Sequence, residues 1–261
     1  MENKDLKKIY EKAYKKGENK HFTNLIEGLH SEEREILNAT QWKGKKVLDV
    51  GCGTGLFVHE AAKRGAFVIG LDYVPQAIEI AKRTHKHPNI EFRCEDIHKT
   101  INKYKGRKFD VVVSVGTVEH LDKPFAMLKL FKQIVKPRGE IIFTCPNWIN
   151  PRGLILQTMR YLFDAPITLA DLHYFSPRIF ERWAAKNKLQ LRWKTFDTSW
   201  GAGDMLLRDL KRRLPNVLRD MGLKNDRGIK NFLKWLKDEA LQVPWTGKYV
   251  GVNTLYHVKK K

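Results

Sequence analysis

Apolar runs and amphipathic stretches alternate along the first half of the chain. Short apolar runs predict strands, and apolar residues repeated every three or four positions predict helices. Strands are expected at residues 47–50, 66–71, 90–94, 109–115 and 140–144. Helices are expected at residues 56–64, 75–82 and 125–135. This alternation predicts right-handed crossovers and therefore a doubly wound, parallel α/β sheet.

The pattern changes after residue 147. Residues 147–175 carry scattered aromatic residues and prolines, which predict an excursion from the sheet rather than another strand and helix. A helix is expected from Ser176-Pro177, followed by a strand at 189–196 and a last strand at 249–258. Two basic amphipathic segments lie between these strands, which predicts a helical insertion over about residues 200–247.

No internal repeat or low-complexity linker divides the chain, so one domain over residues 1–261 is expected. Residues 1–43 are predicted to form an N-terminal helical extension. It consists of a basic amphipathic helix over 4–16 and a second helix with its N-cap at Ser31. The cofactor-binding half is then expected at 44–147, and the substrate-side half at 148–261.

Net charge and cysteine content limit the binding partners and the cellular compartment that we expect for the protein. The formal net charge is +20, and +12 of it falls after residue 150. Such a field favours nucleic acid, an anionic membrane surface or an acidic substrate, although a lysine-rich solvated surface also accounts for it. No run of about 18 apolar residues and no secretory signal is visible, so a cytoplasmic protein is expected, at most peripheral at a membrane. Cys52, Cys94 and Cys145 are predicted to be buried reduced thiols.

A glycine-rich turn joins the first strand to the first helix. The strand at 47–50 runs directly into Gly51, Gly53 and Gly55. Glycines at such a turn let a ligand approach the main chain, and the helix dipole favours an electron-rich group there. The dinucleotide fingerprint G-x-G-x-x-G would require a further glycine where the chain has Leu56, so a pyrophosphate ligand is not favoured.

Three acidic residues mark the ends of three successive strands. Asp72 ends the second strand, where an acid is placed to accept the hydroxyls of a ribose. Asp96 is placed to bond an adenine amine while Ile97 packs on the ring, and Asp49 to meet an ammonium group directly or through water. A single acid of this kind is often only a helix cap, but the three together predict a ligand with an adenosine half and a cationic amino-acid half.

These motifs resemble those of the class I S-adenosylmethionine-dependent methyltransferases, and most of all the ubiquinone-biosynthesis-type O-methyltransferases and related small-molecule enzymes. The resemblance covers residues 44–147 in detail. It rests on VLDVGCGTG at 47–55, Leu71-Asp72, CEDI at 94–97, FDVVVSVGTVEHL at 109–121 and KPRG at 136–139. It implies a seven-stranded Rossmann-like sheet with the last strand antiparallel, and S-adenosylmethionine as the cofactor.

The resemblance also implies how the cofactor is held. Gly51 and Gly53 would lie against the methionine part and Tyr73 beside the adenosine, while Gly55 and Val115 complete the expected cofactor-binding set. The reaction would be an in-line displacement, in which the enzyme chiefly aligns the nucleophile. No metal is expected, because the fifth strand ends in TCPN at 144–147 without the acids of metal-dependent members.

Catalytic residues are expected just after the fourth strand. A histidine beside a carboxylate, here His120 and Glu119, is able to deprotonate a hydroxyl, phenol or ammonium near neutral pH. The alternative is that this pair only caps and orients the next helix. His173, in a segment that resembles the approach to the sixth strand of these relatives, is a third catalytic candidate or a packing residue.

Two acceptor classes remain open. The first is an oxygen or nitrogen of a small or lipid-like molecule, and the second is RNA or protein held by the basic surface. The fourth strand is followed by Gly116-Thr117 rather than by the Asn/Asp-Pro-Pro-aromatic motif of base methylation. No Pro-Cys nucleophile for cytosine-C5 methylation occurs either. The small or lipid-like acceptor is therefore preferred, with anionic membrane contact as an accompanying option and nucleic acid as the second choice.

Overall fold

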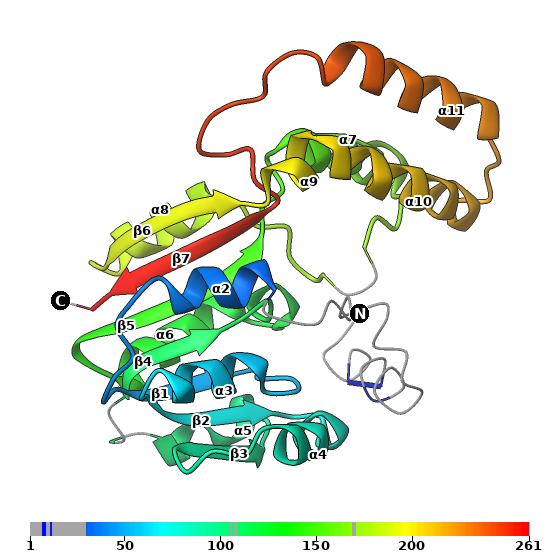
Figure 1. Cartoon of the computed structure of the whole chain (residues 1–261). Coiled ribbons are helices and arrows are strands. Elements are labelled where there is room, and N and C mark those ends of the chain that lie inside the picture. The colour runs from blue at the N-terminus through cyan, green and yellow to red at the C-terminus, as the bar shows by residue number, and fades with distance from the viewer. Residues whose placement is uncertain are drawn as a thin grey trace. The chain divides into compact units, whose positions relative to one another are not determined.

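The computed structural model describes residues 7, 8, 11, 30–104, 106, 109–168 and 171–260 (Figure 1). The helix expected over residues 4–16 falls mostly outside these residues. The chain forms two compact units. The first holds Met1–Cys145, Arg178–Trp193 and Leu255–Lys261, and the second holds Pro146–Pro177 and Lys194–Thr254.

A seven-stranded sheet has the order β3-β2-β1-β4-β5-β7-β6. Its strands are β1 (Lys46–Val50), β2 (Phe67–Asp72), β3 (Ile90–Cys94), β4 (Phe109–Ser114), β5 (Val135–Pro146), β6 (Gln190–Phe196) and β7 (Asn253–Lys259). Strands β1 to β5 pair in parallel, and β7 runs antiparallel to its neighbours (Figure 1). The doubly wound fold with an antiparallel last strand, expected from the sequence, is confirmed.

Helices connect these strands. They are α2 (Ser31–Leu37), α3 (Leu56–Lys63), α4 (Pro75–Thr84), α5 (Ile97–Thr100), α6 (Pro124–Ile134) and α8 (Pro177–Lys186), with short 3₁₀ turns η2 (Ile101–Tyr104) and η3 (Val118–His120). The chain moves from β1 outward to β3, then returns to β4 and moves outward in the other direction to β5. Right-handed crossovers therefore place α3 and α4 on one face of the sheet and α6 on the other. The strand order reverses between β1 and β4, which is where ligands bind in such sheets.

The centre of the sheet explains why β1 and β4 are the most apolar strands. Val47, Leu48 and the valines at 111–113 are fully or almost fully buried, since helices cover both faces of a doubly wound sheet. Burying each such side chain contributes about 1.5–3 kcal/mol. The register pairs Asp49 with Val113 on β4 and with Gly70 on β2, so an acid near the end of β1 lies deep between two neighbouring strands.

Some element boundaries differ from the sequence-based prediction. The KPRG segment at 136–139, expected as a turn, forms an irregularity within β5, whose pairing with β4 shifts between Phe109 and Val111. Strand β7 begins at Asn253 rather than at Tyr249. In α2, Ser31 is the first helical residue and His30 occupies the N-cap position. The predicted burial of Cys94 is wrong, because β3 lies at the edge of the sheet and the thiol is exposed.

The second unit is helical. It contains α7 (Pro151–Phe163), α9 (Thr198–Ala202), α10 (Asp204–Asp220), α11 (Asp226–Trp235) and the π-helical turn η4 (Leu236–Ala240). Trp148 and Leu156 pack in one buried cluster with the apolar stripe of α10, Leu206, Leu210 and Leu214. The helices expected within 200–247 are thus present. Helix α7 was missed, although Asn150 at its N-cap and Pro151 at its first position are a typical helix-start signal.

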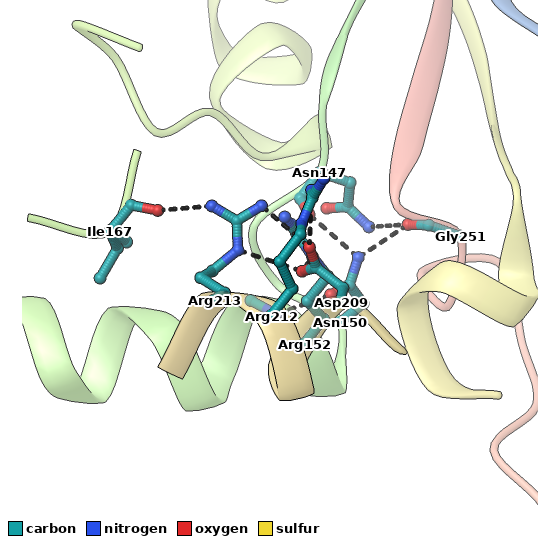
Figure 2. A network of polar contacts seen from close by, with 9 residues as sticks. Asn147, Asn150, Arg152, Ile167, Asp209, Arg212, Arg213 and Gly251 are labelled. Atoms are coloured by element: carbon teal, nitrogen blue, oxygen red, sulfur yellow. Dashed lines mark hydrogen bonds and ion pairs between the residues drawn. The ribbon is translucent and has the colours of Figure 1, made fainter. Parts of the chain in front are cut away.

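A buried ion network ties α7 to α10 (Figure 2). The Asp209 carboxylate accepts a 2.8 Å hydrogen bond from Arg152 Nε and two further bonds from Arg213, at 3.1 and 3.0 Å. Arg213 also donates to the carbonyl of Ile167. Burial alone would raise the pKa of Asp209, but the two guanidinium groups lower it below its usual range. Asp209 is therefore a charged carboxylate that the two arginines hold between the helices.

Within the part of the chain that the structure describes, no helix combines the length and apolar character needed to cross a membrane.

Candidate active site

The glycine-rich turn has the conformation that its sequence demands. Gly51, Gly53 and Gly55 all have positive φ, at 80°, 51° and 85°, a region that other residues rarely adopt. A Cβ on Gly51 would overlap the side chain of Thr117, and one on Gly55 would lie 2.6 Å from Phe92 Cζ. The glycines therefore permit both the turn itself and its close packing against the loop after β4.

The main-chain N–H groups of this turn are largely engaged within the chain. Gly51 and Cys52 both donate to the carbonyl of Leu71, at 2.8 and 2.9 Å. Gly53 donates to Asp72 Oδ2, and Gly55 to the carbonyl of Cys52. The sequence predicts that such N–H groups face a ligand, whereas here they fasten the turn to the end of β2. We therefore expect side chains around the turn to contribute more to recognition than the motif alone indicates.

Asp72 lies at the carboxyl end of β2, beside the turn. Its Oδ1 accepts from the Val74 N–H and its Oδ2 from the Gly53 N–H, both at 2.9 Å. Burial raises the pKa of Asp72, and these main-chain hydrogen bonds oppose that rise. Each carboxylate oxygen has a second lone-pair direction, so Asp72 is able to hold the turn and accept ribose hydroxyls together.

Asp49 is the most buried acid of the site, at 1% exposure. Its Oδ1 atom has no hydrogen-bond partner among the described residues. Burial raises the pKa of Asp49 well above its usual range, and the charges of Asp72 and Glu33 raise it further. Burying an unpaired carboxylate is costly, so Asp49 is placed where a cationic ligand group would be stabilised.

Residues expected around the adenosine also gather at the ends of β2 and β3. Burial raises the pKa of Tyr73, and the nearby charges of Asp72 and Asp96 add to this effect. Asp96 Oδ1 accepts from the His98 N–H at 3.0 Å and so caps α5, while Ile97 is buried. Capping uses one oxygen of Asp96, so both interpretations of this residue, helix cap and adenine contact, are compatible with the structure.

The ends of β1 and β4 are joined directly. Ser114 Oγ donates to the carbonyl of Val50 at 3.0 Å, across the point where the strand order reverses. The next residue, Val115, accepts a 2.9 Å bond at its carbonyl from Thr117 Oγ1, and the Gly116 N–H donates to Thr144 Oγ1 of β5. These bonds fix the loop that carries Val115 against the glycine-rich turn.

The Glu119–His120 pair follows in η3. His120 Nε2 lies 3.9 Å from Glu119 Oε1, and the side chains are 16% and 4% exposed. The structure thus gives the histidine a buried carboxylate neighbour, as the sequence predicts. His173 belongs to the second unit, where its ring stacks on Phe175 with 5.3 Å between centroids.

Two further acids, Glu32 and Glu33, lie close to these residues although the sequence analysis does not name them. They stand in the first turn of α2, where acids are common because they offset the helix dipole. Both Oε atoms of Glu32 lie 3.6 Å from the position that a Cβ of Gly116 would take, and Glu119 Oε1 lies 3.9 Å from the same position. Glu33 is near enough to Asp49 to raise its pKa. Local sequence gives no signal for this, because the proximity arises from packing of α2.

The charges and surfaces of these residues fit the chemical groups of S-adenosylmethionine. The orphaned Oδ1 of Asp49 and the neighbouring acids favour a ligand with positive charge, which this cofactor carries on its ammonium and sulfonium groups. Asp72, Tyr73 and Ile97 supply hydrogen-bonding and apolar surfaces at adjoining strand ends, as an adenosine half requires.

The fold and this site are those of the class I methyltransferases. A family model described as "Methyltransferase domain" matches residues 41–199, more than half of the chain, and the chain belongs to this family. The methyltransferase family expected from the sequence is confirmed.

Individual relatives agree with this assignment. The chain is 37% identical over 107 residues to a ubiquinone biosynthesis O-methyltransferase of Coxiella burnetii, a match that covers 40% of this chain and 45% of the relative. The chain thus matches about half the length of that curated relative. Among solved structures, a SAM-dependent methyltransferase from Archaeoglobus fulgidus has a TM-score of 0.58 at 18% identity, covering 87% of this chain and 90% of the other. A phosphoethanolamine N-methyltransferase of Haemonchus contortus has a TM-score of 0.55 at 15% identity, covering 88% and 52%.

Proposed function

We propose that this protein transfers a methyl group from S-adenosylmethionine to an oxygen or nitrogen of a small or lipid-like acceptor. The observation that carries the proposal is the adjacency of two features at the β1–β4 switch point. One is the acid-lined glycine turn, which suits the donor, and the other is the buried Glu119–His120 pair.

The proposed donor site uses residues from three strand ends. Asp49 faces the cationic amino-acid half, Asp72 takes the ribose, and Asp96 with Ile97 takes the adenine. When bound, S-adenosylmethionine supplies an electrophilic methyl carbon, so the chain needs to align the acceptor and remove its proton.

His120 is the proposed proton acceptor. Its Nε2 lies 3.9 Å from the Glu119 carboxylate, and its imidazole takes the proton of an acceptor hydroxyl or ammonium. The buried carboxylate then stabilises the imidazolium that forms. His173 is a second candidate for contact with the acceptor.

The lipid-like character of the acceptor is supported by the second unit. Residues of α7, α10 and α11 line an open groove of about 500 Å³, and most of its surface is apolar. Its lining includes Leu154 and Met159 of α7, Leu218 of α10 and Phe232 of α11. The named O-methyltransferase relative and the N-methyltransferase structure support oxygen and nitrogen as the alternative acceptor atoms.

Label transfer tests the acceptor class. The full chain is incubated with methyl-labelled S-adenosylmethionine and, separately, with small-molecule, lipid, RNA and protein fractions. Label in the small-molecule or lipid fraction, absent with a His120→Gln variant that still binds the donor, supports the proposal. Label confined to RNA or protein would replace it with the second candidate, which the net charge of +20 favours.

We also propose peripheral contact with an anionic membrane. Aromatic and apolar side chains of the second unit are exposed, among them Tyr161 and Phe163 of α7, Trp235 of α11 and Trp245. Lys230, Lys234 and Lys237 accompany them on α11 and η4. Exposed aromatic and basic residues together are typical of surfaces that lie on anionic lipid.

A further inference from the structure

Asp49 and Glu33 present buried carboxylate oxygens without partners. Among the described residues, neither Asp49 Oδ1 nor Glu33 Oε2 has a hydrogen bond. The two come from different elements, β1 and α2. Both Oε atoms of Glu32, in the first turn of α2, lie 3.6 Å from the position of a Gly116 Cβ, and the adjacent Thr117 packs on Gly51. The charge of Glu33 also raises the pKa of Asp49. No described lysine or arginine forms an ion pair with either of them. Two buried like charges without a cation repel each other and are poorly solvated.

The position of α2 is set firmly at its other end. The carbonyl of Leu37 accepts hydrogen bonds from Trp42 Nε1 at 2.7 Å and from Arg64 Nη1 at 2.8 Å. Ile36 and Leu37 are buried, and α2 contacts α3. The C-terminal end of α2 is thus fastened to the segment before β1 and to the end of α3. Its first turn lies beside Gly116, in the loop that packs on the glycine-rich turn.

A purely structural role explains Glu33 less well. Acids in the first turn of a helix offset the helix dipole, but that effect does not require a buried oxygen. Glu32, one residue earlier, serves the same end of the helix and lies beside Gly116. Glu33 instead has a buried Oε2 without a hydrogen bond, as Asp49 has a buried Oδ1. A cation between the two carboxylates would relieve both.

We propose that Glu33 of α2 and Asp49 of β1 together bind the α-ammonium group of S-adenosylmethionine. This inference rests on the proposed function for its donor. It adds a carboxylate from outside the sheet to the recognition of the amino-acid half, and so makes α2 part of the donor site. The ammonium offers three N–H donors, enough for both carboxylates at once.

Calorimetric titration of Glu33→Gln with ligands that differ at one group tests this. S-adenosylhomocysteine keeps the ammonium and lacks the sulfonium charge, so its affinity should fall about tenfold or more, the scale of a charge-assisted hydrogen bond. The analogue of S-adenosylhomocysteine with hydrogen in place of the α-amino group should bind the variant and the unaltered protein equally. Combining Glu33→Gln with Asp49→Asn should cost less than the product of the single effects, since both act on one group.

The control is Glu79→Gln, which removes an exposed acid of α4 and makes the same change in net charge. It should leave every affinity unchanged. An unaltered protein that fails to bind S-adenosylhomocysteine would contradict the proposed function itself. If it binds, two results would overturn the Glu33 assignment alone. One is an unchanged affinity of Glu33→Gln for S-adenosylhomocysteine, and the other is an equal loss for the deaminated analogue.

Discussion

Asp72 combines two tasks in a single side chain. It holds the glycine-rich turn through the Gly53 N–H, and it stands where a ribose would be recognised. Asp72→Ala should therefore weaken S-adenosylmethionine binding by about tenfold or more, since a charge-assisted hydrogen-bond acceptor is lost. Calorimetry measures the affinity, and circular dichroism checks that the fold is retained. Unchanged affinity would remove the ribose role from Asp72.

Asp49 is expected to lower the stability of the ligand-free protein. Its pKa is raised in the folded state by burial and by the charges of Asp72 and Glu33, and the Cys52 thiol is also close to it. The folded chain then binds the proton more tightly than the unfolded chain. The free energy of unfolding therefore falls as pH rises from the ordinary carboxyl pKa of 3.8 through the raised value.

Asp49→Asn should accordingly raise the melting temperature near neutral pH, by about 2–4 °C for each kcal/mol gained. This gain in melting temperature should shrink as the pH approaches 3.8. Added S-adenosylhomocysteine should also stabilise the variant less than it stabilises the unaltered protein. Asp110→Asn is the control, and it should lower the melting temperature near neutral pH instead of raising it. Burial favours the neutral form of Asp110, but Lys136 and the Lys46 N–H outweigh it and lower the pKa of that carboxyl. A lower melting temperature for Asp49→Asn at neutral pH would contradict the prediction.

At the scale of elements, the glycine-rich turn packs against β3 and α4 too closely to leave room for a side chain at Gly55. A Cβ at Gly55 would meet Phe92 Cζ at 2.6 Å and Ala81 Cβ at 3.1 Å, with φ at 85°. Gly55→Ala should lower the free energy of unfolding by about 2–4 kcal/mol, from strain and overpacking together.

Gly44→Ala is the matched control for this change. Gly44 also has a positive φ, 75°, but a Cβ there meets nothing within 4 Å. It should cost only the conformational strain, about 1–2 kcal/mol. Urea unfolding compares the two variants, and equal losses would show that the contact with Phe92 contributes nothing.

The α7–α10 ion network allows a second prediction for the elements. Asp209→Asn leaves the buried guanidinium of Arg152 without its counter-charge and should cost about 3–5 kcal/mol in urea unfolding. The double variant Arg152→Met with Asp209→Leu should lose less, because the buried guanidinium of Arg152 is removed together with its counter-charge and only the partly exposed Arg213 loses a partner. A larger loss in the double variant would show that the network stabilises the unit beyond simple charge compensation.

At the scale of the whole molecule, the exposed aromatic residues and the charge of +20 predict binding to anionic vesicles. Vesicles rich in phosphatidylglycerol should sediment the full chain at low salt, and phosphatidylcholine vesicles much less. Trp235→Ser should weaken binding several-fold, because a 54% exposed indole is lost.

Phe67→Ser is the control for the vesicle experiment, since it removes an aromatic side chain of similar exposure, 52%, from the sheet unit. It should leave vesicle binding unchanged. No sedimentation, together with RNA retardation that weakens steeply with salt, would assign the charge to nucleic acid instead.

The sequence by itself determined the sheet and the glycine-rich turn, and it predicted the donor. The reason is that these signals are local. Strand periodicity, the three glycines and the acids at strand ends each act within a few residues, and parallel strands then bring their carboxyl ends to one edge. Asp49, Asp72 and the Glu119–His120 pair could therefore be named from their positions in the chain.

Tertiary packing alone decided the rest. The first turn of α2 lies beside Gly116, and α2 is fastened at Leu37 by Trp42 and Arg64, residues that lie 5 and 27 positions away. Cys94 is exposed because β3 is an edge strand of the sheet. No local sequence pattern encodes the order of the strands. The Arg152–Asp209 pair spans 57 residues. Contacts between distant segments depend on how helices and strands pack, and that packing is what brought the acids of α2 to the site.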